Sequence, residues 1–154
     1  IMAGECAKEC FRILEPLFKR GELGNIGRAV VGTVEGDLHD IGKNLFIMFL
    51  KSMGFEVIDL GVDVPAQKFV EAVRIYNPDI VGVSALLTTT VINMEKVINA
   101  LKEAGLRDRV KIIVGGAAVT KDLVERMGAD AGGVDAYEGA IICRKWMEER
   151  RRSG

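Results

Sequence analysis

Residues 28–44 read RAVVGTVEGDLHDIGKN, and this stretch decides the fold. Its first part, residues 29–34, is almost wholly apolar, which is typical of a strand covered on both faces in a parallel sheet. A polar loop follows, and from Ile41 onward apolar residues recur at helical spacing. A strand, a loop and a helix in this order form the first half of a βαβ unit.

The same alternation continues to the end of the chain. We predict strands at residues 29–34, 55–60, 80–84 and 110–114 and near Ala131, and helices at residues 41–53, 66–76, 91–104, 121–127 and 137–150. Right-handed connections between such elements give an α/β fold, a doubly wound five-stranded parallel sheet flanked by helices. Ligands bind such sheets at the carboxyl ends of the strands, which here lead into residues 35–42, 61–65, 85–90 and 115–120.

Composition limits the classes of function that the chain can have. Its 154 residues, 49% hydrophobic and 28% charged, provide for one sizeable core but not for two. The net charge of −1 excludes the broad positive field that attracts nucleic acid or anionic membranes. No apolar run approaches the roughly 20 residues of a membrane span, and no secretory signal is visible. We therefore predict a cytoplasmic protein without nucleic-acid or membrane partners.

The first of these loops contains His39, the one histidine of the chain, two residues after Asp37. The spacing of Gly42 and Lys43 does not fit a phosphate-binding loop, and a single histidine cannot hold zinc. A metal-bound histidine usually donates its other N–H to a carboxylate, and Asp37 is placed to accept it. A metal bound here must bring its other ligands, as a tetrapyrrole does, and Gly42 would let a bulky ring approach. The alternative is an ordinary loop histidine beside Asp40, the cap of the following helix.

Two further loops favour a ligand site. The sequence Ser84-Ala85-Leu86-Leu87-Thr88-Thr89-Thr90 places hydroxyl groups directly after an apolar strand, where they could bind a polar ligand. Thr89 or Thr90 could instead cap the next helix, although this leaves Ser84 and Thr88 unexplained. The sequence Gly115-Gly116-Ala117-Ala118 provides a surface of small residues, or else a tight turn, which needs only one glycine.

Together, Asp37-x-His39-x-x-Gly42, Ser84-x-Leu86 and Gly115-Gly116 resemble the signature of the cobalamin-binding domain family, from about Arg28 to the C-terminus. The loop is most similar to that of corrinoid proteins in methyltransferase systems and of methionine synthase. The resemblance implies cobalamin or a related cobamide as the cofactor. It also implies that His39 binds the cobalt as the metal ligand, while the nucleotide tail lies between the sheet and the helices.

The resemblance also implies roles for individual residues. Asp37, His39 and Thr90 would form a catalytic hydrogen-bond relay, in which Asp37 orients His39 and Thr90 stands where the family often has a serine. Ser84, Leu86 and Thr88 would line the tail channel together with Gly115 and Gly116. The residues expected to bind the cofactor are Gly36, Asp37, Leu38, His39, Asp40, Ile41, Gly42, Ser84, Leu86, Thr88, Gly115, Gly116 and Ala117.

The function that the resemblance implies is that of a methyl carrier, without deciding whether the chain counts as an enzyme. A substrate-specific methyltransferase would deliver a methyl group to Co(I), and a second methyltransferase would pass it to tetrahydrofolate or a thiol. A reductive activase would be a further partner. Residues 1–27 would be the last helix of an N-terminal helical cap plus a linker, and residues 28–154 the corrinoid-binding domain. The alternatives are an adenosylcobalamin-dependent mutase small subunit, a cobalamin-binding regulator and a cofactor-free interaction domain.

Overall fold

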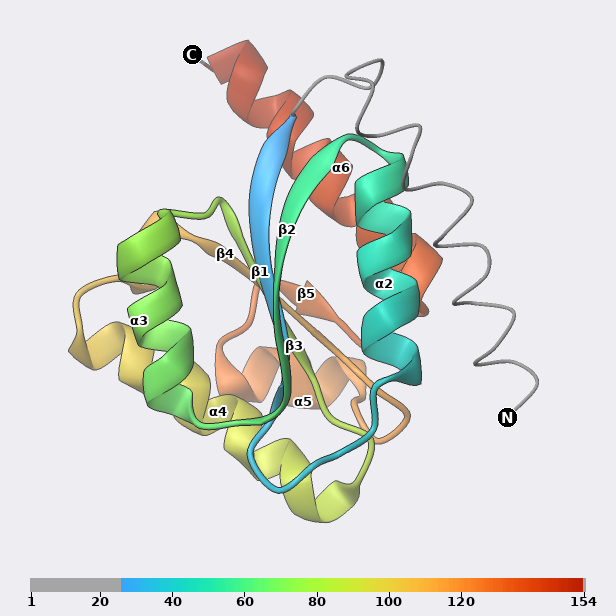
Figure 1. Cartoon of the computed structure of the whole chain (residues 1–154), viewed down its shortest axis with the longest axis vertical. Coiled ribbons are helices and arrows are strands. Elements are labelled where there is room, and N and C mark those ends of the chain that lie inside the picture. Colours follow the sequence, from blue (N-terminus) through green and yellow to red (C-terminus); the bar gives the residue numbers. More distant parts are fainter. Residues whose placement is uncertain (1–25, 154) are drawn as a thin grey trace.

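The computed structural model of the chain describes residues 26–153, and its centre is a five-stranded parallel sheet. The strands lie in the order β2-β1-β3-β4-β5 (Figure 1). They are β1 (Gly27–Val34), β2 (Phe55–Val64), β3 (Ile80–Ser84), β4 (Lys111–Gly115) and β5 (Ala131–Gly132). The helices are α2 (Ile41–Ser52), α3 (Ala66–Tyr76), α4 (Thr88–Glu103), α5 (Lys121–Met127) and α6 (Ala136–Ser153), with a short 3-10 turn at Arg107–Arg109. The predicted fold class is confirmed. The cap helix predicted at the start of the chain lies outside the described residues.

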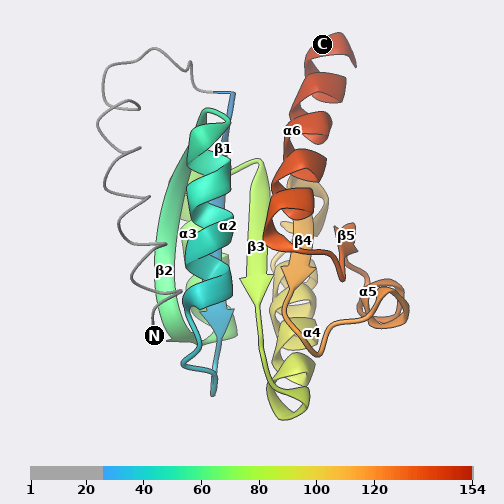
Figure 2. The same cartoon turned by 90° about the vertical axis from the view of Figure 1, so that its right-hand side faces the viewer.

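Helices cover the sheet on both faces, with α2 and α6 on one face and α3, α4 and α5 on the other (Figure 2). This arrangement explains the apolar run of β1, in which the last six residues are buried. On the first face, Ile47 and Leu50 of α2 pack in one cluster with Cys143 and Met147 of α6. None of the helices within residues 26–153 is both long and apolar enough to pass through a membrane.

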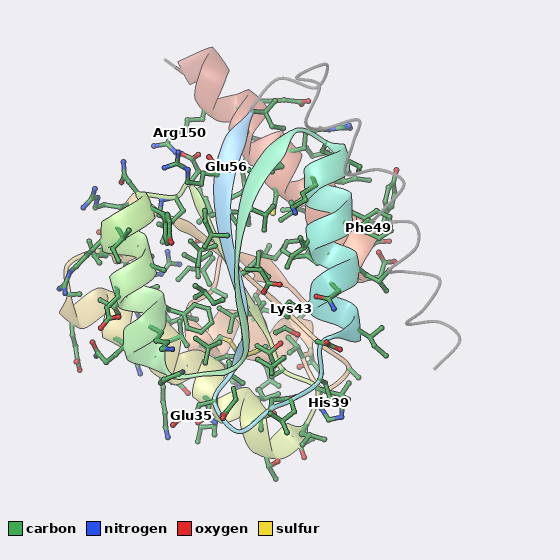
Figure 3. The ribbon with its side chains drawn as sticks, viewed as in Figure 1. Glu35, His39, Lys43, Phe49, Glu56 and Arg150 are labelled. Atoms are coloured by element: carbon green, nitrogen blue, oxygen red, sulfur yellow. The ribbon has the colours of Figure 1, made fainter. Side chains whose placement is uncertain are left out.

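The strand order reverses at β1, because β2 pairs with one of its edges and β3 with the other. The loops after β1 and β3 therefore leave the sheet toward opposite faces and open a crevice between them. The strand register places Thr33, Ser84 and Gly115 side by side at the carboxyl ends of β1, β3 and β4. His39 and Glu35 lie at this edge, whereas Glu56 and Arg150 lie at the opposite one (Figure 3).

Several elements differ slightly from the predicted bounds, and the differences in α4 and β2 affect the site. Helix α4 begins at Thr88 rather than at residue 91, and the Leu87 carbonyl accepts hydrogen bonds from the amides of Thr90 and Val91. Strand β2 continues to Val64 instead of ending at residue 60. Its pairing with β1 resumes beyond Gly61 through register shifts, which are β-bulges. This extension brings the end of β2 beside the loop after β1.

Candidate functional site

The loop that carries His39 starts with a tight turn. The Asp37 amide donates to the Val34 carbonyl at 3.1 Å, and Gly36 takes a φ of +87°, in the region that glycine adopts without steric cost. The hydroxyl of Thr33, which is fully buried in β1, donates to the His39 carbonyl at 3.1 Å. The backbone of the loop is therefore hydrogen-bonded to β1 at Asp37 and at His39.

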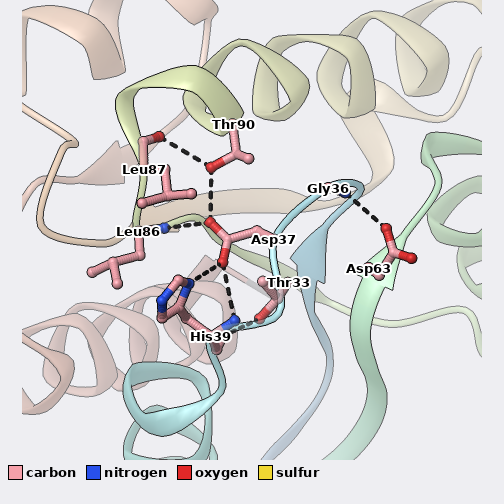
Figure 4. Close-up of polar contacts among 8 residues, drawn as sticks. All are labelled: Thr33, Gly36, Asp37, His39, Asp63, Leu86, Leu87 and Thr90. Carbon is pink, nitrogen blue, oxygen red and sulfur yellow. Dashed lines mark hydrogen bonds and ion pairs between the residues drawn. The ribbon is translucent and has the colours of Figure 1, made fainter.

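The centre of the site is the carboxylate of Asp37, which is completely buried and accepts four hydrogen bonds (Figure 4). Its Oδ1 accepts from the His39 amide at 3.0 Å and lies 2.8 Å from His39 Nδ1. Its Oδ2 accepts from the Leu86 amide at 2.8 Å and from the Thr90 hydroxyl at 2.7 Å. One carboxylate thus joins the loop after β1 to the loop after β3.

Two opposing effects determine the pKa of Asp37. Burial raises this pKa, because it disfavours the charged form. The hydrogen bonds from the His39 amide, the Thr90 hydroxyl, the Leu86 amide and the His39 ring lower it, and their sum is greater. The pKa of Asp37 therefore lies well below its usual range, and the carboxylate is ionised at neutral pH.

The ionised carboxylate fixes the tautomer of His39. Because it can only accept hydrogen bonds, Nδ1 of the neutral ring must carry the proton, and Nε2 keeps its lone pair. No residue within 26–153 binds Nε2 in the structure, and 55% of the His39 side chain is exposed. Nor do the described residues contain a cluster of three His, Cys, Asp or Glu side chains that could hold a metal ion. His39 thus presents one metal-binding nitrogen, and residues 26–153 provide no cluster of co-ligands.

A cavity of about 280 Å³ lies beside this loop, between the sheet and the helices α2 and α6. Its lining is mostly apolar or small, and it consists of Val31, Gly42, Lys43, Leu45, Phe46, Gly82, Val83, Ser84, Ile113, Val114, Gly115, Gly116, Val134, Asp135, Ala136 and Gly139. The Lys43 ammonium group, which is buried, lies 2.9 Å from each carboxylate oxygen of Asp59. The cavity extends from the first turns of α2 along β1, β3 and β4.

The last residue of β4, Gly115, and the next residue, Gly116, have different surroundings. A Cβ at Gly115 would meet no atom within 4 Å, so this residue leaves open space beside the cavity. A Cβ at Gly116 would lie 1.7 Å from the carbonyl oxygen of Ala85, and Gly116 has a φ of +137°. The close approach of the loop after β3 therefore requires glycine at position 116, whereas the structure leaves room for a side chain at position 115.

The other predicted site residues lie around this centre rather than in the cavity. Leu38, Ile41 and Leu86 are 72%, 49% and 39% exposed, which is unusual for large apolar residues. Asp40 precedes α2 as its N-cap residue but makes no side-chain cap hydrogen bond. Thr88 and Ala117 are exposed and do not line the cavity, and Thr88 instead borders a groove between α4 and α5.

Three residues that contact the loop were not predicted from the sequence. Thr33 binds the His39 carbonyl, Asn93 donates to the Glu35 carbonyl at 2.7 Å, and Asp63 binds the Gly36 amide at 2.7 Å. Each binds the backbone from another element, and a backbone contact leaves no residue pattern in the sequence. The one available signal was the alignment of Thr33 with Ser84 at the ends of adjacent predicted strands.

The B12 binding domain family matches residues 27–143 of this chain, which include all five strands and the site just described. The chain belongs to this family. Its cofactor is cobalamin or a related corrinoid.

Known relatives of this B12-binding domain are corrinoid proteins. Trimethylamine corrinoid protein 1 of Methanosarcina acetivorans is 42% identical over 140 residues, which are 90% of this chain and 65% of that protein. The monomethylamine corrinoid protein of Methanosarcina barkeri superposes with a TM-score of 0.77 at 35% identity, over 87% of this chain and 64% of that one. A chain of the methanol:cobalamin methyltransferase complex MtaBC from Methanosarcina barkeri gives a TM-score of 0.76 at 34% identity, over 80% and 47% of the two chains. The chain therefore spans about two thirds or less of the length of these relatives.

The residues of the B12-binding domain fit a corrinoid. A corrinoid brings the macrocycle that holds its cobalt, so a single protein nitrogen would be enough as a further ligand, and His39 Nε2 could provide it. The nucleotide tail needs a long space with small neighbours, and the cavity beside Gly115 provides it. The exposed apolar side chains of Leu38, Ile41 and Leu86 suit contact with a large ring.

Proposed function

We propose that this chain is the corrinoid-binding part of a methyl carrier that serves two methyltransferases. The observation that carries the proposal is the imidazole of His39, which Asp37 holds in the ligand-competent tautomer just before helix α2, whose first turns line an apolar cavity. The names of the relatives support it, because they describe methylamine corrinoid proteins and a methanol:cobalamin methyltransferase complex. The bound corrinoid supplies the cobalt–carbon bond chemistry, and the protein tunes it.

Each residue of the proposed site has a separate task. His39 would bind the cobalt through Nε2, and Asp37 would orient the imidazole by accepting the Nδ1–H hydrogen bond. The Thr90 hydroxyl and the Leu86 amide donate to the second oxygen of Asp37, which fixes the position of the carboxylate. Ser84, Gly115 and Gly116 line the cavity that receives the nucleotide tail. The exposed residues Leu38, Ile41 and Leu86 would contact the macrocycle of the corrinoid.

The proposed partners follow from this role. A substrate-specific methyltransferase would supply the methyl group, a second one would pass it to tetrahydrofolate or a thiol, and a reductive activase would restore the carrier. We assign the choice of methyl donor to the first of these partners. Methanol and methylamines both occur in the names of the relatives. The donor, the acceptor and the cytoplasmic location stay predictions.

The axial ligand can be tested directly, because His39 is the single histidine of the chain. Protein grown on ¹⁵N-labelled histidine is loaded with hydroxocobalamin and reduced by one electron, which makes the cobalt visible by electron paramagnetic resonance. An axial ¹⁴N splits each cobalt line into a triplet, whereas an axial ¹⁵N splits it into a doublet. We expect a doublet in the labelled protein. A persistent triplet, or a protein that takes up no corrinoid, would overturn the proposal.

A substitution of the same residue should separate the axial bond from the fold. We expect His39→Ala to change the visible spectrum of bound hydroxocobalamin while lowering the free energy of unfolding by about 1 kcal/mol or less, because the ring is largely exposed. Glu35→Ala is the matched control, since Glu35 is an exposed residue of the same loop whose backbone carbonyl, not its side chain, binds Asn93. It should leave the spectrum unchanged. Identical spectra for wild type and His39→Ala would contradict the assigned ligand.

A further inference from the structure

Asp63 has an unusual backbone conformation at the end of β2. Its φ is +51°, in the left-handed region that side chains with a Cβ rarely adopt. Among residues 26–153, only Asp63 and Asn77 combine a side chain with a positive φ. Asn77 has an ordinary reason, because it ends helix α3 as its left-handed C-cap. Asp63 lies in a strand, so the reason for its conformation must come from the contacts that it makes.

These contacts all lead to the loop that carries His39. The carboxylate Oδ1 of Asp63 accepts from the Gly36 amide at 2.7 Å (Figure 4). The Asp63 amide donates to the Asp37 carbonyl at 3.0 Å. Asp63 thus uses its side chain and its backbone at the same time, and the two bonds enclose Gly36 and Asp37 from the side of β2. The left-handed φ lets one residue make both.

We infer that Asp63 is a positioning residue, which holds the Gly36–Asp37 segment so that the Asp37 carboxylate meets His39 Nδ1. The inference rests on the proposed function in one respect, namely that His39 is the axial ligand. The bond from the Gly36 amide to the Asp63 carboxylate is charge-assisted and therefore stronger than a bond between neutral groups. It fixes the turn in which Gly36 has its positive φ, and this turn determines where the buried carboxylate of Asp37 points.

Two substitutions separate the carboxylate from the backbone conformation. Asp63→Gly removes the carboxylate but adopts the same φ easily and keeps the amide bond to Asp37, so it should not unfold the protein. Asp63→Asn keeps an acceptor oxygen and tolerates the left-handed region. The matched control is Asn77→Gly, which also relieves a positive φ and loses one side-chain contact, that of Asn77 with Arg109 at 2.9 Å. Asn77 lies near the amino ends of the strands, whereas His39 lies near their carboxyl ends.

The first measurement uses the full chain without corrinoid, so it does not depend on the proposed function. Amide hydrogen exchange at Gly36 and His39 should become about tenfold faster in Asp63→Gly, since a charge-assisted bond is lost. In ¹⁵N spectra of the single histidine, the Nδ1–H tautomer should lose population toward that of free histidine. Asp63→Asn should lie between Asp63→Gly and wild type, and Asn77→Gly should match wild type. Equal exchange and equal tautomer populations in Asp63→Gly and Asn77→Gly would overturn the inference.

The second measurement repeats the labelled-histidine resonance experiment on the loaded variants. We expect a smaller fraction of histidine-bound cobalt in Asp63→Gly than in wild type, partly restored in Asp63→Asn. If wild type itself shows no doublet, the proposed function fails, whatever Asp63 does. If wild type shows the doublet and Asp63→Gly shows the same fraction of it, the inference about Asp63 fails and the proposed function stands.

Discussion

Replacing Asp37 by asparagine is expected to lower the free energy of unfolding by about 2–4 kcal/mol at neutral pH. Both oxygens of the buried carboxylate accept from donors, His39 on Oδ1 and Leu86 and Thr90 on Oδ2. An asparagine has only one oxygen, so its amino group must face one pair of these donors in either orientation. Chemical denaturation of both proteins measures the loss.

The effect of this substitution should depend on pH in a defined direction. The pKa of Asp37 is lower in the folded protein than in the unfolded chain, where it is about 3.9. The stabilisation by the carboxylate is therefore complete above about pH 4 and is lost as the pH falls below that value. Asparagine has no such dependence. The difference in unfolding free energy between wild type and Asp37→Asn should thus narrow when denaturation is repeated at about pH 3.

Thr90→Val is the control for this first prediction, because it removes one of the four donors and keeps the carboxylate. It should lower the free energy of unfolding less, by about 1–2 kcal/mol. In the loaded protein, Asp37→Asn should also reduce the fraction of cobalt bound to His39, since the ring loses the partner that fixes its tautomer. Unfolding free energies that are equal for wild type and Asp37→Asn at neutral pH would contradict this account of the network.

The fold and the centre of the site were predictable because both depend on local patterns. The apolar run of residues 29–34 indicated a doubly covered strand, and the structure buries it on both faces. The spacing of Asp37 and His39 indicated a hydrogen bond between their side chains, and Asp37 Oδ1 lies 2.8 Å from His39 Nδ1. In each case, residues close in sequence determine the geometry.

The features that escaped prediction depend on contacts between distant segments. Strand β2 was expected to end before Gly61, but its pairing with β1 carries it to Val64 and makes Asp63 a neighbour of Gly36. The start of α4 at Thr88 was not predicted either, because residues 85–90 were expected to form a loop, whereas a bond between Thr90 and Asp37 was expected from the family resemblance. The sequence shows which residues carry a hydroxyl or a carboxylate group. It does not show which distant backbone group such a side chain binds in the folded protein.

The second large effect concerns the two glycines at the end of β4. The same substitution to alanine should destabilise the protein at one of them and have little effect at the other. Gly116→Ala places a Cβ against the Ala85 carbonyl oxygen at a positive φ, and it should lower the free energy of unfolding by about 3 kcal/mol or more. Gly115→Ala meets no atom within 4 Å, so its unfolding free energy should stay within about 0.5 kcal/mol of wild type. Denaturation of the two variants side by side tests both values.

Gly115 then allows the cavity to be tested without disturbing the fold. Gly115→Leu extends a side chain into the space that we assign to the nucleotide tail, and it should weaken retention of hydroxocobalamin about 10- to 100-fold, as overpacking costs of this kind do. Equilibrium dialysis measures retention, and Gly115→Ala serves as its control. A Gly115→Leu protein that folds and binds hydroxocobalamin as tightly as wild type would place the tail elsewhere. Weakened binding in a stably folded Gly115→Leu would tie retention to this cavity, because His39 and Asp37 are untouched.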